Sequence, residues 1–191
     1  MAPTGPDDMM AAVAASMAER TGRTLDEWVD LVRASGIDPL DRNAVRRWLK
    51  SEHDVLQNSQ WAIADAAARA AGWVPPTIEE YVDGQYAGPK VALRPIFDRL
   101  RQILQSFGDD VTIEGRSTYT PFVRRRQFAA VAAATRGRVD VGLRYSEPPA
   151  SALLTPATAP GQATHRLSLT APEEITGEVE SLLRAAYDQN G

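Results

Sequence analysis

The first part of the chain carries apolar side chains every three or four positions, which is the spacing of an amphipathic helix. Thr24 and Glu27 have the spacing of a capping box and predict the start of one helix. Asn58 is placed to cap another, while Gly36 and Gly72 are placed to end helices. All four tryptophans lie in this part, and we expect them to pack its core. The predicted helices cover residues 7–20, 24–35, 42–52 and 58–71.

The helical pattern breaks at two consecutive prolines, which predict a short, stiff linker over residues 73–76. Thr77 and Glu80 form a second capping-box pattern, which predicts a short helix directly after the linker. A longer helix is expected to follow, ending near residue 107. Because proline lacks a backbone N–H, Pro95 must lie in the first turns of this helix or mark a later start.

Toward the C-terminus the apolar period changes to two, which predicts strands. Pro121 interrupts the second of these and indicates an edge position. Residues 135–137 predict a hairpin turn. Thr170 and Glu173 form a third capping-box pattern, which predicts a closing helix. The predicted strands cover residues 111–114, 117–126, 128–134, 138–145 and 164–169, with an irregular loop over 146–161.

This order of elements predicts an α+β protein, in which an N-terminal helical module precedes a small antiparallel sheet flanked by two helices. We expect the helical module over residues 7–73 and the α+β domain over 77–189. Residues 1–6 contain two prolines and a glycine, which predicts a disordered start.

Composition narrows the possible chemistry. The chain has no cysteine and only two histidines, His53 and His165, which excludes disulfides, thiolate catalysis and a three-histidine zinc site. It has no P-loop and no dinucleotide fingerprint, so we expect neither a metal nor a cofactor, and we favour a protein that is not an enzyme. No apolar run reaches the roughly 20 residues of a membrane span, and the N-terminus lacks the basic start of a secretory signal. We therefore expect a cytoplasmic protein that does not bind membranes.

Several motifs resemble known but uncharacterised families. The segments TGRTLDEW (residues 21–28) and WLKSEH (48–53) are similar to a small helical domain of unknown function in bacterial proteins. The segments FVRRRQF (122–128), RVDVGL (138–143) and THRL (164–167) resemble an α+β domain of unknown function that often follows it. The second domain also looks distantly like the YdhG-like and YjbR-like domains, for which the resemblance implies DNA binding.

The feature that points most directly to binding is a run of arginines in the predicted sheet. Residues 111–145 contain seven arginines and two acids, although the whole chain has a net charge of −4. Alternation would place Arg124 and Arg126 on one strand face, and Arg138 and Arg144 on the polar face of another. Guanidinium groups that converge in this way offer forked N–H donors whose geometry fits the oxygens of a phosphate or carboxylate. The other interpretation is a solvated sheet face whose arginines pair with acids.

Three further residues complete the candidate set. Arg116 adds to the arginine run, and Tyr119 lies near enough in sequence to stack on a base or ring. His165 shares a predicted strand face with apolar residues, which indicates either a hydrogen-bonded core histidine or an acid/base group. His53 is expected to end a helix and complement its dipole.

Three functional hypotheses follow. The first is a non-enzymatic module that binds an anion, either nucleic acid or a phosphate or carboxylate metabolite, through Arg116, Arg124, Arg126, Arg138 and Arg144. The second is a small-molecule pocket beside the alanine-rich segment 128–134, with His165 and Tyr119 as polar groups and catalysis as an open question. The third is an interaction protein that pairs with a partner or forms a homo-oligomer.

Overall fold

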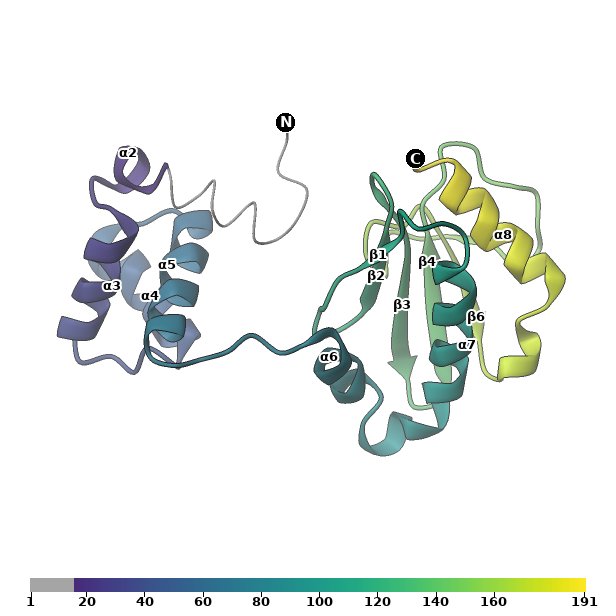
Figure 1. Ribbon diagram of the computed structural model, residues 1–191, viewed down its shortest axis with the longest axis horizontal. Helices are drawn as coiled ribbons and strands as arrows, with labels where there is room; N and C mark the ends of the chain where they lie inside the picture. The colour runs from purple at the N-terminus through teal and green to yellow at the C-terminus, as the bar shows by residue number, and fades with distance from the viewer. Residues whose placement is uncertain (1–15) are drawn as a thin grey trace. The chain divides into compact units, whose positions relative to one another are not determined.

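The structure is a computed structural model that describes residues 16–191, so the predicted start, 1–6, and most of the predicted helix 7–20 lie outside the described residues. The chain divides into two compact units, Met1–Pro75 and Pro76–Gly191. The described part of the first unit is helical, and the second combines helices with an antiparallel sheet (Figure 1). The predicted α+β class is confirmed.

The first unit, the helical unit, packs short helices around its own apolar core. The Glu27 backbone N–H donates to Thr24 Oγ1 at 3.3 Å, and the Thr24 N–H donates to the Glu27 carboxylate at 2.7 Å, which confirms the capping box. Trp28, which is buried, donates from Nε1 to Thr21 Oγ1 at 2.7 Å. The core also contains Met17, Val32, Val45, Leu49, Val55, Ile63 and Ala64. The helices are α2 (Met17–Thr21), α3 (Leu25–Ala34), α4 (Arg42–His53) and α5 (Gln57–Ala70).

Two predictions for α5 are wrong. The helix begins at Gln57, so Asn58 lies inside it and does not cap it. Trp61 is 46% exposed instead of belonging to the core, because the buried side of α5 carries Ile63 and Ala64. Residues 61 and 63 differ by about 200° around a helix, so they cannot share a face.

The second unit, the α+β unit, begins with helices that cover one side of its sheet. Thr77 and Glu80 form the predicted capping box, with the Thr77 N–H donating to the Glu80 carboxylate at 2.7 Å. The long helix starts later than the apolar pattern alone suggests, at Arg94, and Pro95 lies in its first turn. The residues directly before it, Gly88–Leu93, form a 3-10 helix, which is wound more tightly than an α-helix. These elements are α6 (Ile78–Gln85), η1 (Gly88–Leu93) and α7 (Arg94–Gln105).

The sheet has six strands in the order β1-β2-β3-β4-β6-β5, and every neighbouring pair is antiparallel. The prediction that Pro121 marks an edge is wrong, since β1 pairs with β2 on the side away from β3. The paired residues of β2 are Phe122 and Val123, and the Pro121 carbonyl accepts from the N–H of Glu114, directly after β1, at 3.2 Å. The strands are β1 (Thr112–Ile113), β2 (Thr120–Val123), β3 (Gln127–Thr135), β4 (Arg138–Leu143), β5 (Thr155–Pro156) and β6 (His165–Leu169). The short strand β5 lies in the segment predicted to be an irregular loop.

The closing helix also starts later than predicted. The Thr170 N–H and hydroxyl both donate to the Glu174 carboxylate, at 2.7 and 2.8 Å, but only the 3-10 turn η2 (Pro172–Glu174) follows directly. Ile175 then leaves the helical conformation, with ψ of 77°, and is buried in the core. Helix α8 (Gly177–Asp188) begins only after this residue, so burial of Ile175 overrides the local capping signal.

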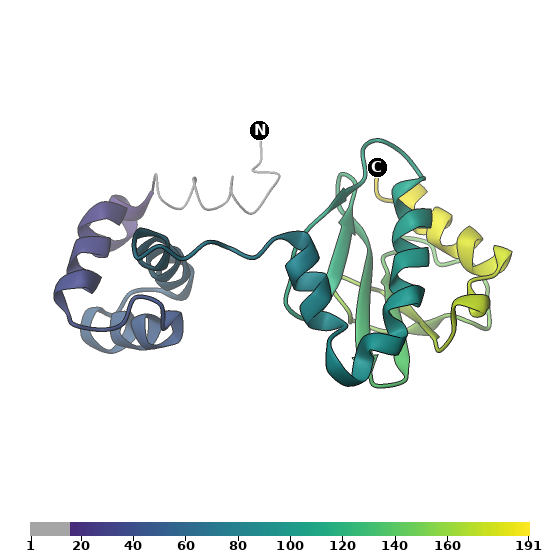
Figure 2. The same ribbon diagram turned by 60° about the horizontal axis from the view of Figure 1, so that its bottom comes forward.

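One face of the sheet forms the main core together with α7 and α8 (Figures 1 and 2). Val139, Val141 and Leu143 point into it, as the alternation predicts. The opposite face is partly covered by the loop after β5. A Cβ on Gly142 would lie 2.4 Å from the Pro160 carbonyl oxygen, so this glycine permits close contact between strand and loop.

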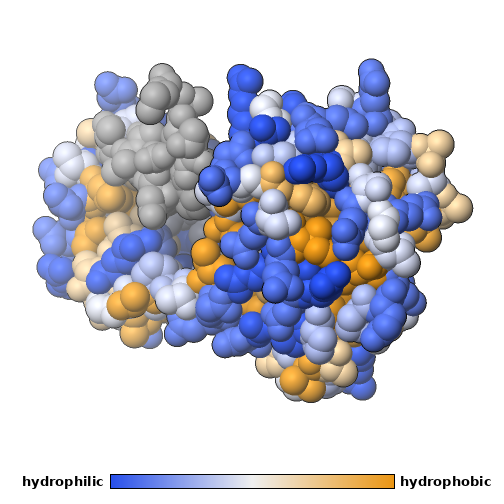
Figure 3. All heavy atoms as spheres, turned by 45° about the vertical axis from the view of Figure 1, so that its right-hand side comes forward, coloured by the Kyte–Doolittle hydropathy of each residue, from blue (hydrophilic) through white to orange (hydrophobic). Residues whose placement is uncertain are grey.

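The surface of the α+β unit mixes polar and apolar residues. Figure 3 shows hydrophilic side chains on its visible face with apolar atoms between them. Large exposed apolar residues lie on separate elements, for example Ile78 on α6, Val91 on η1 and Leu153 in the loop before β5. Self-association or partner binding through such residues stays a prediction.

None of the helices within residues 16–191 is long and apolar enough to cross a membrane. The same residues contain no cluster of three or more histidine, aspartate or glutamate side chains arranged to hold a metal ion.

Candidate functional site

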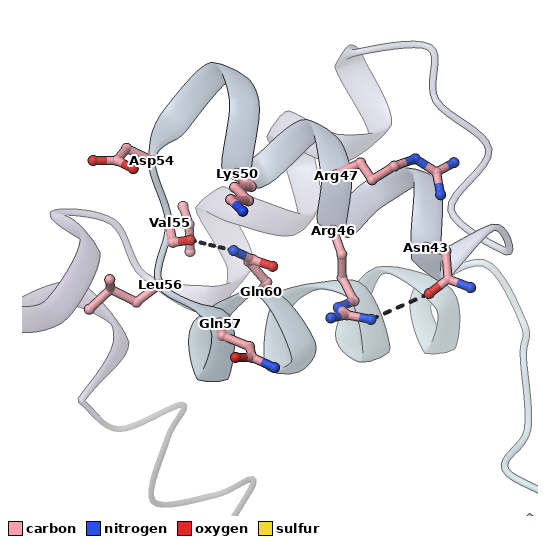
Figure 4. A pocket seen from close by; sticks show the side chains of 9 residues that line it. All are labelled: Asn43, Arg46, Arg47, Lys50, Asp54, Val55, Leu56, Gln57 and Gln60. Carbon is pink, nitrogen blue, oxygen red and sulfur yellow. Dashed lines mark hydrogen bonds between the residues drawn. The ribbon is translucent and has the colours of Figure 1, made fainter.

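A basic groove lies between α4 and α5 in the helical unit. It encloses about 510 Å³ and receives Arg46, Arg47 and Lys50 from α4 (Figure 4). These residues recur at helical spacing, which places them along one side of α4. We call this feature the α4–α5 groove. Its remaining lining residues are Asn43, Asp54, Val55, Leu56, Gln57 and Gln60.

The connection between the two helices is fixed by local contacts. Asp54 ends α4 in the left-handed conformation, with φ of 50°, and the next residue, Val55, is buried in the core. Gln60, which is 7% exposed, donates from Nε2 to the Val55 carbonyl at 2.6 Å. This hydrogen bond ties the first turn of α5 to the connection between the helices.

Arg46 stacks on an exposed tryptophan at one side of the groove. Its guanidinium carbon lies 3.5 Å from the centre of the Trp61 ring, and its Nη1 donates to Asn43 Oδ1 at 3.3 Å (Figure 4). The guanidinium group is held over the ring by a cation–π interaction. Neither partner is an acid, so the positive charge of Arg46 is not neutralised.

The potential of the groove is positive because its cations have few acidic neighbours. Within residues 16–191, Arg47 and Lys50 make no ion pair, and Asp54 is the one acid that lines the groove. No acid occurs between Asp41 and Glu52 in the sequence. The first turn of α5 also lacks an acidic residue and a side-chain cap, so its N–H groups add to the positive potential.

A second arginine–tryptophan stack in the same unit is neutralised. Arg42 and Arg69 lie over the Trp73 ring at 4.3 and 5.8 Å from its centre. Both also pair with Asp65, at 3.5 and 2.9 Å. The two stacks therefore differ in charge, although they use the same residue types.

His53 lies between two tryptophans of the helical unit. Its ring contacts Trp28 and Trp48 edge-on, with centroid separations of 5.2 and 4.6 Å. It stands in the last turn of α4, as the sequence predicts. These ring contacts give His53 a packing role.

The arginines singled out in the sequence do not meet on one face of the sheet. Arg124 and Arg126 lie in the turn after β2, where strand alternation does not apply. Arg124 pairs with Asp110 at 2.6 Å and lies 4.3 Å from the centre of the Tyr187 ring, while Arg126 donates to the Gln189 carbonyl at 3.0 Å. Both guanidinium groups are thus directed to other parts of the same unit.

The remaining arginines of the set also have partners of their own. Arg138 stands on the polar face near the start of β4 and pairs with the buried Asp140 at 2.8 Å. Arg144 follows the other end of β4 and donates to Gln162 Oε1 at 2.6 Å. Arg116 pairs with Glu114 at 2.7 Å. The expected convergence of these guanidinium groups is therefore wrong.

Two family models match this chain. One, described as a domain of unknown function (DUF5655), matches residues 82–190, and another, described as a domain of unknown function (DUF4287), matches residues 9–66. The first match spans more than half of the 191 residues. The chain belongs to the DUF5655 family. No curated protein and no solved structure matches it.

These matches confirm the resemblance to a two-part uncharacterised protein, whereas the likeness to YdhG-like and YjbR-like domains stays a prediction. The DUF5655 match lies within the α+β unit, which we call the DUF5655 domain. All residues that line the α4–α5 groove lie within the DUF4287 match.

In the DUF5655 domain, His165 lies at the start of β6 on the inner face of the sheet. It pairs with Leu143 across the strands, its ring contacts Tyr145 at 5.8 Å, and its Nδ1 lies 3.1 Å from Thr164 Oγ1. Tyr119 precedes β2, is half-buried, and makes no side-chain hydrogen bond or ring contact among residues 16–191. The structure does not bring these two residues together with the arginines.

The sequence signal for the groove is visible in retrospect. Arg46, Arg47 and Lys50 form a basic stretch without acids, and Trp61 follows in the next helix. The seven arginines of residues 111–145 are more numerous, but their number alone does not indicate whether acids neutralise them. The apolar pattern of α4 predicts how the helix packs and carries no information about the charge of its polar side.

Proposed function

We propose that the chain binds nucleic acid through the α4–α5 groove, with the phosphate backbone held by Arg46, Arg47 and Lys50. Cations of this kind supply most of the affinity for a phosphate backbone, because their binding releases condensed counterions. The observation that carries the proposal is three cations in one groove with a half-exposed tryptophan beside them.

Trp61 favours single strands over duplexes. Proteins that bind unpaired strands combine a positive groove with aromatic side chains on which bases stack. The part of the Trp61 ring that Arg46 leaves uncovered is available to an unpaired base, and 46% of this residue is exposed. A duplex offers its phosphates to the same cations but keeps its bases stacked internally.

The test is fluorescence anisotropy with a labelled single strand and the matching duplex at one fixed salt concentration. Replacing both Arg47 and Lys50 with alanine removes two exposed cations that have no ion pair in the described residues. We expect affinity for both nucleic acids to fall about tenfold or more, since each phosphate contact contributes to counterion release.

The matched control replaces Arg20 and Arg33 with alanine. Both are exposed arginines on α2 and α3 that do not line the groove, so the control removes the same net charge elsewhere on the helical unit. An equal loss of affinity in both double variants would contradict a localised site.

Trp61→Ala separates stacking from charge. We expect it to weaken binding to the single strand at least about fivefold, from the magnitude of base–aromatic stacking, and to change duplex binding little. Because Trp61 is not part of the apolar core, the variant should fold, which circular dichroism can verify. Equal effects on the two nucleic acids would contradict the stacking role.

A further inference from the structure

The DUF5655 domain contains a separate concavity at the end of its alanine-rich strand. It encloses about 500 Å³ between the α6–η1 segment and the far end of β3, a volume within the range of small-molecule sites. The residues that matter for its chemistry are Gln85, Lys90, Ser117, Thr118, Ala134 and Arg136. We call it the β3-end pocket.

The β3-end pocket is cationic. Lys90 is half-buried and donates from Nζ to the Ala133 carbonyl at 2.5 Å, which fixes the ammonium group and leaves its other protons free. Arg136, in the turn between β3 and β4, makes no hydrogen bond or ion pair among residues 16–191. No acid lines this pocket. Two cations without a counter-charge favour an anionic ligand.

Gln85 gives a second, independent reason to expect a ligand in this pocket. It is 7% exposed, and its Nε2 donates to the Arg116 carbonyl at 2.8 Å and lies 3.3 Å from Thr120 Oγ1. These contacts fix the orientation of the amide, and its buried Oε1 accepts no hydrogen bond within the described residues. A buried acceptor without a partner is costly, so a ligand that brings a donor to Oε1 would relieve that cost.

Small side chains and a strand irregularity make room for this ligand. Ala132, Ala133 and Ala134 form the wall contributed by β3. The register with β4 shifts between Ala133 and Thr135, so Ala134 is left without a paired partner. Bulges of this kind often occur beside functional sites, because they redirect the strand and interrupt its hydrogen bonds.

We propose that the β3-end pocket binds a small anionic metabolite that carries a hydroxyl or amino group next to its phosphate or carboxylate. Lys90 and Arg136 hold the anionic group, the hydroxyls of Ser117 and Thr118 donate to it, and Gln85 Oε1 accepts from the neighbouring donor. This site is independent of the α4–α5 groove, because each is lined by residues of one unit only.

The experiment uses the full chain, labelled with ¹⁵N, and follows amide chemical shifts during titration. The probes are glycerol 3-phosphate, glycerate, inorganic phosphate and glycerol. We expect glycerol 3-phosphate, glycerate or both to shift amides in residues 84–90, 117–118 and 132–136 in a saturable way. Inorganic phosphate should bind more weakly, and glycerol should produce no saturable shift at these amides. The relative affinity of the first two probes distinguishes a phosphate from a carboxylate ligand.

Three variants test the assignment. Arg136→Ala should weaken binding about tenfold through loss of a charge-assisted contact. Ala134→Trp should abolish binding by filling the pocket from an exposed position, without entering the core. Arg125→Ala is the control, because Arg125 is an exposed arginine in the turn at the opposite end of β3 and should leave binding unchanged.

Two results would overturn the proposal. The first is that neither glycerol 3-phosphate nor glycerate gives saturable shifts at these amides. The second is that the shifts persist in Ala134→Trp or weaken equally in Arg125→Ala. Equal affinity for inorganic phosphate and glycerol 3-phosphate would remove the role assigned to Gln85.

Discussion

At the scale of single residues, partners decide what an arginine does. Arg124 and Arg47 are both arginines in basic stretches of the sequence. Arg124 is bound by Asp110 and lies over Tyr187, while Arg47 lines an open groove without an ion pair in the described residues. Strand alternation correctly predicted the inward face of β4, because that rule depends only on neighbouring positions. It failed for Arg124 and Arg126 because they belong to a turn, and no local pattern reveals an acid that lies far away in sequence.

The Asp110 cluster leads to a prediction about acid stability. Hydrogen bonds from Arg124 and Tyr187 hold the pKa of Asp110 below its usual range. A carboxyl group with a lowered pKa in the folded state stabilises the fold above its unfolded pKa of about 3.9, and this contribution is lost as pH falls through the folded pKa. Asp110→Asn should therefore destabilise the DUF5655 domain at pH 6, and the difference from the unmodified protein should shrink below about pH 4.

Thermal unfolding followed by amide NMR signals of residues 76–191 measures this effect. The matched control is Asp109→Asn, since Asp109 is exposed and makes no side-chain hydrogen bond or ion pair within residues 16–191. A difference between Asp110→Asn and the unmodified protein that stays constant from pH 6 to pH 3 would contradict the role assigned to the Asp110 carboxylate.

At the scale of elements, capping-box patterns predicted the start of a helix correctly where no buried residue interrupted that helix. The capping boxes at Thr24 and Thr77 were predicted correctly, because both involve exposed residues within one turn. The third, at Thr170, failed because Ile175 packs into the core and interrupts the helix. The α4–α5 groove was missed for a related reason. The apolar side of α4 specifies its packing, while the function proposed here depends on its polar side.

The two capping boxes lie in different units and predict separable effects on stability. Thr24→Ala and Thr77→Ala should each cost about 1 kcal/mol through loss of an N-cap hydrogen bond. All four tryptophans lie between residues 28 and 73, so tryptophan fluorescence reports on the helical unit. Thr24→Ala should lower the urea midpoint measured by fluorescence, and Thr77→Ala should leave it unchanged. A shift of the fluorescence midpoint in Thr77→Ala would show that the two units unfold together.

At the scale of the whole molecule, the chain combines two separate cores with two differently built cationic sites. The helical core and the core of the DUF5655 domain consist of different residues, so each unit positions its own site. Composition could not indicate these sites, because the chain as a whole is acidic, with a net charge of −4. Their positive character comes from the local arrangement of a few side chains.

The salt dependence of single-strand binding tests the central claim most directly. The logarithm of the binding constant falls linearly with the logarithm of salt concentration, by about 0.7 for each phosphate neutralised on a single strand. Removing Arg47 and Lys50 together should therefore make this slope shallower by about 1.4, while the Arg20 and Arg33 double variant keeps the original slope. An unchanged slope after loss of Arg47 and Lys50 would show that the α4–α5 groove does not contact the nucleic-acid backbone.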